Sequence, residues 1–153
     1  MLRGVLEDDL QTFYEHQRDA EATTMAAHSP REWDAFVSHW RRTVLGNRDN
    51  VAQTILVDDQ VAGYVASWEQ DGRRLIAYWI GREYWGRGVA RSAIDEFLRT
   101  HERQRPIHAY VALSNARSIR VLEKCGFQPA GEPVVGPDGV AEVLFHLNPS
   151  ELR

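Results

Sequence analysis

The stretch YWGRGVARS, residues 84–92, follows the apolar segment RRLIAYWI (73–80) and leads into an amphipathic pattern. A strand, a glycine-containing loop and a helix in this order create a site for an anion. The first backbone N–H groups of a helix have no partner within the helix, and the helix dipole is positive there. Two glycines, which lack a Cβ, would let a phosphate approach the backbone. An ordinary tight turn into a helix explains the same residues, so both interpretations stay open at this point.

Downstream of the loop, the chain predicts a helix, a strand and a second helix. Apolar residues recur at helical spacing over residues 89–98, and a proline ends that helix before residue 107. The segment IHAYVAL (107–113) alternates as a strand does. Ser114 or Asn115 then caps a helix that runs to about Lys124, and a glycine two residues later stands where a left-handed helix stop is expected.

Upstream of the loop, three consecutive strands are expected. They are VAQTILV (51–57), VAGYVASWE (61–69) and RRLIAYWI (73–80), and the short turns between them make them antiparallel. At the carboxyl-terminal end, a turn at Asp138-Gly139 precedes the last strand, EVLFHL (142–147).

The amino-terminal part predicts a strand and two helices. The strand is LRGVL (2–6), and Asp8 or Asp9 caps the first helix. The second helix should start at Ser29-Pro30-Arg31-Glu32, which combines a hydroxyl N-cap, a proline at the first helical position and a glutamate three residues after the cap.

The resulting element order is β-α-α-β-β-β-α-β-α-β-β. Strands 73–80 and 107–113 are separated by a helix, and a right-handed crossover of this kind makes them parallel neighbours. The fold class is therefore α/β, a layered domain with a mixed sheet. The length of 153 residues fits one domain spanning residues 1–153.

Charge and cysteine content exclude several classes of function. The formal net charge of −4 argues against broad nucleic-acid binding, which needs a basic face. The single cysteine, Cys125, excludes an internal disulfide and a cysteine-built zinc site. The start MLRGVLEDDL has acidic residues where a signal peptide needs an apolar core, and no apolar run reaches the length of a membrane span. We expect a cytoplasmic protein with no nucleic-acid or membrane partner.

Two spaced motifs resemble a known family. SNARSIRVLEKCGF (114–127), taken with YWGRGVA (84–90), is similar to the paired signature of the GNAT superfamily of acyl-CoA-dependent N-acyltransferases. The element order also matches that of the superfamily. Within it, the sequence resembles most the branch of ribosomal-protein alanine N-acetyltransferases. The resemblance implies a mostly antiparallel sheet of about six to seven strands, flanked by helices, with the parallel pair splayed at the cofactor site. It also implies acetyl-CoA as acyl donor, an amine as acceptor and no metal.

The resemblance assigns residues to acetyl-CoA. The family's pyrophosphate loop, Gln/Arg-x-x-Gly-x-Gly/Ala, falls on Trp85–Ala90, so that a tryptophan occupies the Gln/Arg position. Backbone groups of the preceding strand would bind the pantetheine arm, and an asparagine and two further side chains would lie along the cofactor. The implied residues are Tyr78, Trp79, Ile80, Trp85, Gly86, Arg87, Gly88, Val89, Ala90, Arg91, Asn115, Ser118 and Lys124.

Each of these residues also has a simpler interpretation. Asn115 alone is explained as a helix N-cap, Tyr78 and Trp79 as packing residues, and Lys124 as a complement to the helix dipole. It is their coincidence in register with the glycine loop that favours a cofactor site.

The family's catalytic side chains are missing from their usual positions. The glutamate that acts as general base five residues before the motif asparagine is Tyr110 here, and the tyrosine that acts as general acid seven residues after it is Leu122. The candidate replacements are His108, Tyr110, Glu21 and Ser118, with Ser114 as an alternative to Ser118. Each of three candidates also has a plain alternative: His108 as an exposed strand histidine, Tyr110 as a packing residue, and Glu21 as a solvated loop carboxylate. Cys125 is expected in the core and not as an acyl carrier.

The first hypothesis is therefore an N-acetyltransferase that acts by direct attack of a primary amine on acetyl-CoA in a ternary complex. The acceptor would be a small amine, a peptide amino terminus or an aminoglycoside-like compound. The backbone N–H of Ile80 would polarise the thioester carbonyl, and Trp33, Trp40, Trp68 and Met25 are candidates for the acceptor wall.

Two rival hypotheses remain. The missing catalytic groups favour, as the alternative, a CoA- or acyl-CoA-sensing module with little turnover. A nucleotide-binding domain is the third possibility, although the loop has neither a G-x-G-x-x-G pattern nor a closing Gly-Lys-Ser/Thr. A monomer and a homodimer are both compatible with the sequence.

Overall fold

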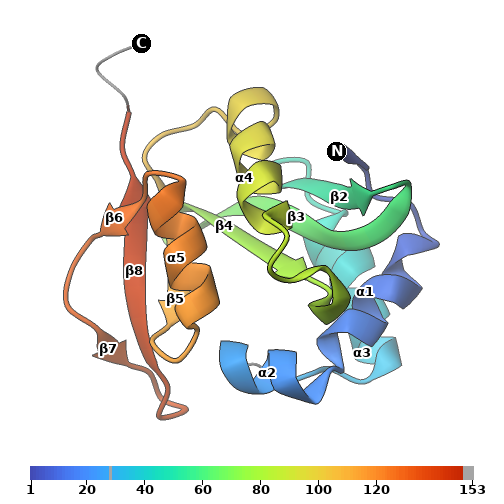
Figure 1. The fold of residues 1–153 in the computed structure, drawn as a ribbon, viewed down its shortest axis with the longest axis horizontal. Helices are drawn as coiled ribbons and strands as arrows, with labels where there is room; N and C mark the ends of the chain where they lie inside the picture. Colours follow the sequence, from blue (N-terminus) through green and yellow to red (C-terminus); the bar gives the residue numbers. More distant parts are fainter. Residues whose placement is uncertain (28, 150–153) are drawn as a thin grey trace.

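The structure is a computed structural model that describes residues 1–27 and 29–149 (Figure 1). In chain order its elements are β1 (Leu2–Gly4), α1 (Asp9–Gln17), α2 (Ala20–Ala26), α3 (Trp33–Ser38), the π-helical segment η1 (His39–Val44), β2 (Val51–Val57), β3 (Gln60–Gln70), β4 (Arg73–Ile80), the short 3₁₀ helix η2 (Arg82–Tyr84), α4 (Val89–Thr100), β5 (Ile107–Ala112), α5 (Ala116–Lys124), β6 (Gln128–Pro129), β7 (Val134–Val135) and β8 (Ala141–Leu147).

The strands form one mixed sheet. Their order is β1-β2-β3-β4-β5-β8-β6, and β7 pairs with β8. The pair β4–β5 is parallel, as the crossover through α4 requires, and the other pairs are antiparallel. The predicted α/β layered fold is confirmed. The described residues form eight strands and not six to seven, because β6 and β7 are two-residue strands.

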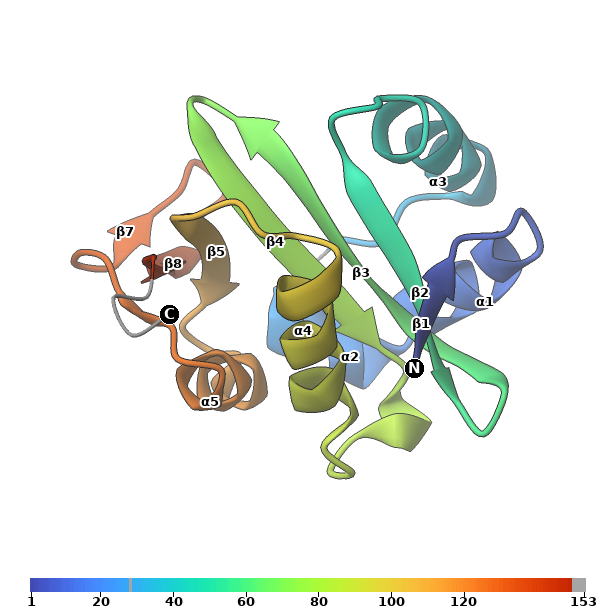
Figure 2. The same cartoon turned by 90° about the horizontal axis from the view of Figure 1, so that it is seen from above.

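Each face of the sheet has its own hydrophobic core. Phe97 of α4 and Leu122 of α5 are buried on one face, and Figures 1 and 2 show these two helices on the same side of the sheet. Phe13 of α1, Phe36 of α3 and Trp40 of η1 are buried on the other face. The amphipathic pattern over residues 89–98 thus matches the face that α4 buries.

β4 and β5 separate along their length. Leu75 and His108 are the one pair in register between these strands in the described part of the chain, and Figure 1 shows the two arrowheads diverging. On its other edge β4 stays paired with β3 up to Ile80. Gly63 allows this close approach, because a Cβ there would overlap the carbonyl oxygen of Trp79. The splay that the resemblance implied is therefore present, with its closed end at Leu75.

A buried polar network holds the closed end of the splay. Glu102, which follows α4, accepts hydrogen bonds from Arg74 Nε at 2.8 Å and from Ser67 Oγ at 2.5 Å. All three residues are buried, and Arg74 precedes the pairing residue Leu75. Burial alone would raise the pKa of Glu102, but the hydrogen bonds from Ser67 and Arg74 lower it overall. The carboxylate therefore stays ionised and ties α4 to β3 and β4.

The amino-terminal helices differ from the expectation. The second helix does not start at Ser29: α3 begins at Trp33, with Glu32 in an extended conformation as its N-cap. Residues 29–32 are exposed, so packing does not support a first turn there, whereas Trp33 packs edge-on against Tyr14. An additional helix, α2, precedes it, and Glu21 lies in this helix and not in a loop.

The described helices of this chain are too short or too polar to cross a membrane.

Candidate active site

A cavity of about 670 Å³ opens where β4 and β5 separate. Strand alternation divides its walls into two halves. One half lies on the face of α4 and α5, and there the cations Arg91, Arg117, Arg120 and Lys124 come from these helices. The other half lies on the face of α1 and α2 and is mainly apolar, with Ala22, Met25, Ala26, Trp79, Tyr110 and Ala112. The cavity therefore passes through the sheet and joins a basic half to an apolar half.

The backbone of β4 is directed into this cavity. Gly81 N–H donates to the carbonyl of Ala62 at 2.8 Å, so the next pair in the antiparallel ladder, Gly63 and Ile80, does not exchange hydrogen bonds. The N–H and C=O groups of Ile80, and by the same alternation those of Tyr78, point away from β3 toward the splay. β4 thus presents the N–H and C=O groups of Tyr78 and the N–H of Ile80 to whatever fills the cavity, while the Ile80 carbonyl accepts a hydrogen bond from Trp85.

The glycine turn adopts the geometry that the sequence predicts. Gly86 and Gly88 have φ values of +75° and +74°, and Gly88 is the N-cap of α4. A Cβ at either glycine would meet no atom within 4 Å, so these residues serve the left-handed backbone and leave open space. The first N–H groups of α4, at Val89 and Ala90, border the cavity.

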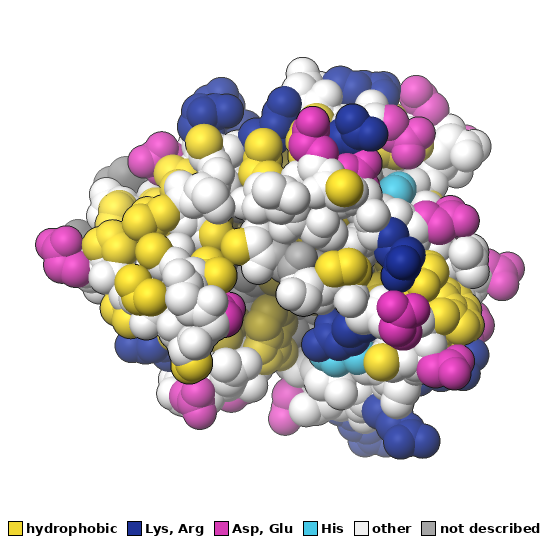
Figure 3. Space-filling model, turned by 90° about the horizontal axis from the view of Figure 1, so that it is seen from below, with side chains coloured by type: hydrophobic (Ala, Val, Ile, Leu, Met, Phe, Trp, Pro, Cys, Tyr) yellow, Lys and Arg dark blue, Asp and Glu magenta, His cyan; other side chains and the backbone are white. Residues whose placement is uncertain are grey.

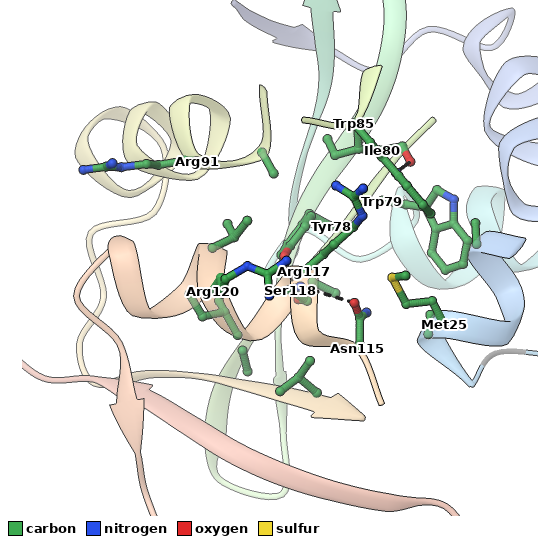
Figure 4. A pocket seen from close by; sticks show the side chains of 18 of the residues that line it. Met25, Tyr78, Trp79, Ile80, Trp85, Arg91, Asn115, Arg117, Ser118 and Arg120 are labelled. Carbon is green, nitrogen blue, oxygen red and sulfur yellow. Dashed lines mark hydrogen bonds between the residues drawn. The ribbon is translucent and has the colours of Figure 1, made fainter. Parts of the chain in front are cut away.

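Trp85, the departure from the family motif, makes two contacts of its own. Its Nε1 donates to the carbonyl of Ile80 at 3.0 Å, which fixes the indole against the end of β4. The Arg117 guanidinium lies over the indole ring, 4.6 Å from its centroid. Figure 4 shows Arg117 reaching from α5 to Trp85, so that this pair bridges the two sides of the splay.

The cations of the cavity differ in part from the predicted ones. Lys124 lines it as expected, but the side chain of Arg91 points away from the centre in Figure 4, and Arg87 lies over the ring of Tyr84. The sequence interpretation missed Arg117 and Arg120. Their positions relative to Lys124 place all three on one face of the predicted helix, and this spacing could have indicated them.

The sequence model of the acetyltransferase (GNAT) domain matches residues 1–128. The chain belongs to the GNAT acetyltransferase family. Proteins of this family use acetyl-CoA, and this GNAT protein is accordingly an acyl-CoA-dependent N-acetyltransferase that transfers an acetyl group to an amine. No curated protein is a detectable sequence relative of the chain.

Solved structures share the fold at low sequence identity. The spermidine N-acetyltransferase from Vibrio cholerae, in complex with CoA and spermine, has a TM-score of 0.81 at 18% identity and covers 97% of this chain and 94% of its own. The aminoglycoside acetyltransferase AAC(6')-Ib, in complex with coenzyme A, has a TM-score of 0.77 at 23% identity and covers 97% and 94%. A GNAT-family acetyltransferase from Bacillus anthracis has a TM-score of 0.79 at 15% identity, covering 96% and 93%. At sequence identities below 25%, this structural similarity shows that the fold is shared and nothing further.

Asn115 of the GNAT signature is a helix cap in this structure. Its side-chain Oδ1 accepts a hydrogen bond from the N–H of Ser118 at 3.2 Å, at the start of α5. Asn115 also borders the cavity, so its amide NH₂ group is within reach of a ligand there. The two interpretations of this residue are therefore compatible.

A pair of hydroxyl groups occupies the region where the family tyrosine is missing. Leu122 occupies the position where the family has its general-acid tyrosine, and its side chain is buried. Tyr78 of β4 and Ser118 of α5 hydrogen-bond through their hydroxyl oxygens at 2.6 Å, and both residues line the cavity. Burial raises the pKa of Tyr78 to about 12, although the hydrogen bond with Ser118 opposes this. The Tyr78 hydroxyl therefore stays protonated at neutral pH.

The structure separates the other catalytic candidates. Tyr110 borders the cavity, and its hydroxyl accepts a hydrogen bond at 3.2 Å from Arg73, which lies at the start of β4 outside the cavity wall. His108 lies at the closed end of the splay and is not among the cavity residues. Burial lowers its pKa, with smaller contributions from Arg73 and His146. Glu21 is exposed on α2 and also lies outside the cavity wall.

Of the four residues predicted for the acceptor wall, Met25 lines the cavity, and Trp33, Trp40 and Trp68 are not among its lining residues. Met25 borders the cavity beside Trp79 (Figure 4). Trp40 is buried in the core between the sheet and the helices α1 and α3, and Trp33 packs on Tyr14 at the surface of that core. The tryptophan next to Met25 in the cavity is therefore Trp79 of β4.

Cys125 is half-buried and packs against the core beneath α4 and α5. Burial raises the pKa of its thiol to about 12, so the reactive thiolate is disfavoured. Within residues 1–27 and 29–149, no group of three or more His, Cys, Asp and Glu side chains is placed to hold a metal ion.

Proposed function

We propose that the acetyl group passes directly from acetyl-CoA to a primary amine in a ternary complex within the splay between β4 and β5. The observation that carries this proposal is the open edge of β4, where the backbone groups of Tyr78 and Ile80 point into a cavity. Pantetheine contains amide groups, and an open strand edge pairs with such groups as it would with another strand.

The glycine turn supports the same orientation of the cofactor. With the pantetheine arm along β4, the pyrophosphate reaches Gly86 and Gly88 at the start of α4. The N–H groups of Arg87, Val89, Ala90 and Arg91 would hold it. Arg117, Arg120 and Lys124 lie on the same side of the sheet and add positive charge near the phosphates.

The chemistry requires few dedicated groups. The amine nitrogen attacks the thioester carbon, the C–S bond breaks as the C–N bond forms, and the nitrogen loses one proton while the sulfur gains one. The N–H of Ile80 would stabilise the developing oxyanion. Tyr78, supported by Ser118, is the proton donor to the departing sulfur, and this pair replaces the tyrosine that Leu122 displaces.

The Tyr78→Phe variant tests this assignment. We expect its kcat to fall by about 100-fold with little change in the KM for acetyl-CoA, because the hydroxyl acts on the leaving group and the ring remains. Initial rates of CoA thiol release measure both constants. Tyr84→Phe is the matched control, since Tyr84 lines the same cavity and also loses a hydroxyl. Equal rates in the wild type and Tyr78→Phe would contradict the assignment.

The function itself is tested by turnover. The protein is mixed with acetyl-CoA and a panel of small amines, peptide amino termini and aminoglycosides, and both free CoA thiol and acetylated product are quantified. We expect one product molecule for each thiol released. Saturable CoA binding without product on any acceptor would instead favour the sensing module.

The kinship with ribosomal-protein alanine acetyltransferases remains a prediction. The solved structures named above include spermidine and aminoglycoside acetyltransferases, and their identity to this chain is below 25%. The acceptor must therefore be inferred from the cavity of this chain.

A further inference from the structure

We propose that the acceptor is a primary monoamine carried on an apolar or aromatic group, and not a polyamine or an aminoglycoside. This inference rests on the proposed function and concerns the apolar half of the cavity. Met25, Ala22 and Ala26 of α2 and Trp79 of β4 form its wall. Viewed from the side on which α2 lies, the molecule is hollowed and hydrophobic atoms lie at the bottom of the hollow (Figure 3).

The charges of the cavity exclude a polycation. Among the described residues that line it, Glu142 is the one carboxylate, against four cations on the opposite half. A polyamine or aminoglycoside carries several ammonium groups, and each buried one needs a charged partner because an unpaired buried charge is costly. One carboxylate can pair with at most one ammonium group of an acceptor that enters the cavity.

Neighbouring acidic groups do not change this balance. Asp19 Oδ2 accepts a hydrogen bond from Arg82 Nε at 2.6 Å, and Asp19 Oδ1 accepts one from the N–H of Ala22. Glu21, on the same helix, lies outside the cavity wall. Of these two carboxylates, Asp19 is therefore already paired, and Glu21 does not line the cavity.

The remaining polar groups of this half are neutral. Gln17 Nε2 donates to the hydroxyl of Tyr64 at 2.8 Å, and burial raises the pKa of Tyr64 to about 12, so its anion does not form at neutral pH. These groups can orient an amine by hydrogen bonds but cannot neutralise further positive charge.

An apolar wall also assists the reaction. Desolvation disfavours the ammonium form, so an amine bound beside Met25 and Trp79 has a lowered pKa and loses its proton more readily. The nucleophile is the neutral amine. The apolar wall thereby favours loss of the proton that a general base would otherwise remove. The family's glutamate, whose position is Tyr110 here, is then less necessary for deprotonating the amine.

A matched pair of amines tests the inference. Pentylamine and putrescine have the same number of non-hydrogen atoms and differ in one terminal group, a methyl against an ammonium. We expect kcat/KM for pentylamine to exceed that for putrescine by at least about tenfold. Phenethylamine should be accepted as well, and spermidine and kanamycin should be poor acceptors.

A substitution in the wall should reverse this preference. Met25→Glu places a second carboxylate beside the amine and is expected to shift the pentylamine-to-putrescine ratio by about tenfold toward putrescine. Met25→Gln is the matched control, because it changes polarity without charge, and its ratio should stay near that of the wild type. Titration with acetyl-CoA verifies that each variant is folded.

The possible outcomes separate the two proposals. A wild-type protein that acetylates putrescine or spermidine as well as pentylamine overturns the acceptor inference and leaves the acetyltransferase function intact. A protein that binds acetyl-CoA but acetylates no amine in the panel contradicts the proposed function itself.

Discussion

Replacing Gly88 with tryptophan is expected to raise the dissociation constant of acetyl-CoA by at least about 100-fold. Gly88 is the N-cap of α4, and a Cβ there would enter open space beside the cavity. An indole at this position would occupy the volume that the pyrophosphate needs and would shield the first N–H groups of α4. Isothermal titration of wild type and variant with acetyl-CoA measures the difference.

Gly72→Trp is a matched control for this variant. Gly72 has a φ of +78°, close to that of Gly88, and its Cβ would also meet no atom within 4 Å. It lies in the turn between β3 and β4 and is not among the cavity residues. Both variants carry the same backbone strain, so Gly72→Trp should bind acetyl-CoA nearly as the wild type does. Undiminished binding by Gly88→Trp would disprove the pyrophosphate assignment.

Replacing Glu102 with alanine is expected to lower the free energy of unfolding by about 3–5 kcal/mol. The change leaves the guanidinium of Arg74 buried without its carboxylate, and it removes an acceptor from Ser67. Because this network lies at the closed end of the splay, the variant should also loosen the pairing of Leu75 with His108. Urea denaturation followed by circular dichroism measures the free energy.

An exposed ion pair provides the comparison. Glu7 pairs with Arg41 at the surface, where both side chains are more than half exposed, and Glu7→Ala should leave the urea midpoint nearly unchanged. The double variant Arg74→Leu with Glu102→Leu should recover much of the stability lost in Glu102→Ala, because no charge is then left unpaired. A destabilisation in Glu102→Ala no larger than in Glu7→Ala would refute a structural role for the network.

Local chemistry made the central part of the fold predictable. The short turns between β2, β3 and β4 required antiparallel pairing, and the helix between β4 and β5 required a parallel pair. The glycines at 86 and 88 adopt the left-handed conformation that their position before a helix indicates. Asn115 caps α5 as its side-chain type predicts.

The amino-terminal helices were less predictable because tertiary contacts decide them. α2 has no clear apolar period, and its N-cap Asp19 is also held by Arg82, 63 residues away in the sequence. The Ser29-Pro30 pattern has the residue types of a helix start, but packing against Tyr14 begins only at Trp33. Local propensity is a weak guide where burial is absent.

The proton donor could not be found by position in a motif. The alternation of β4 shows which way Tyr78 points, but only the structure brings its hydroxyl to Ser118, 40 residues later in the chain. The same holds for Arg117 over Trp85. Strand alternation puts His108 on the same face of β5 as Tyr110, yet the splay leaves it at the closed end, away from the cavity.

The most direct test of the account is a single turnover with acetyl-labelled acetyl-CoA, with the protein in excess and pentylamine as acceptor. The label is then located by mass spectrometry on the amine, on the protein and on CoA. The account predicts that all transferred label lies on the amine nitrogen, in equal amount with the CoA thiol released, and that the protein, including Cys125, carries none. Label that appears on the protein, or that stays on bound CoA with pentylamine and with each other amine tried in its place, would contradict direct transfer.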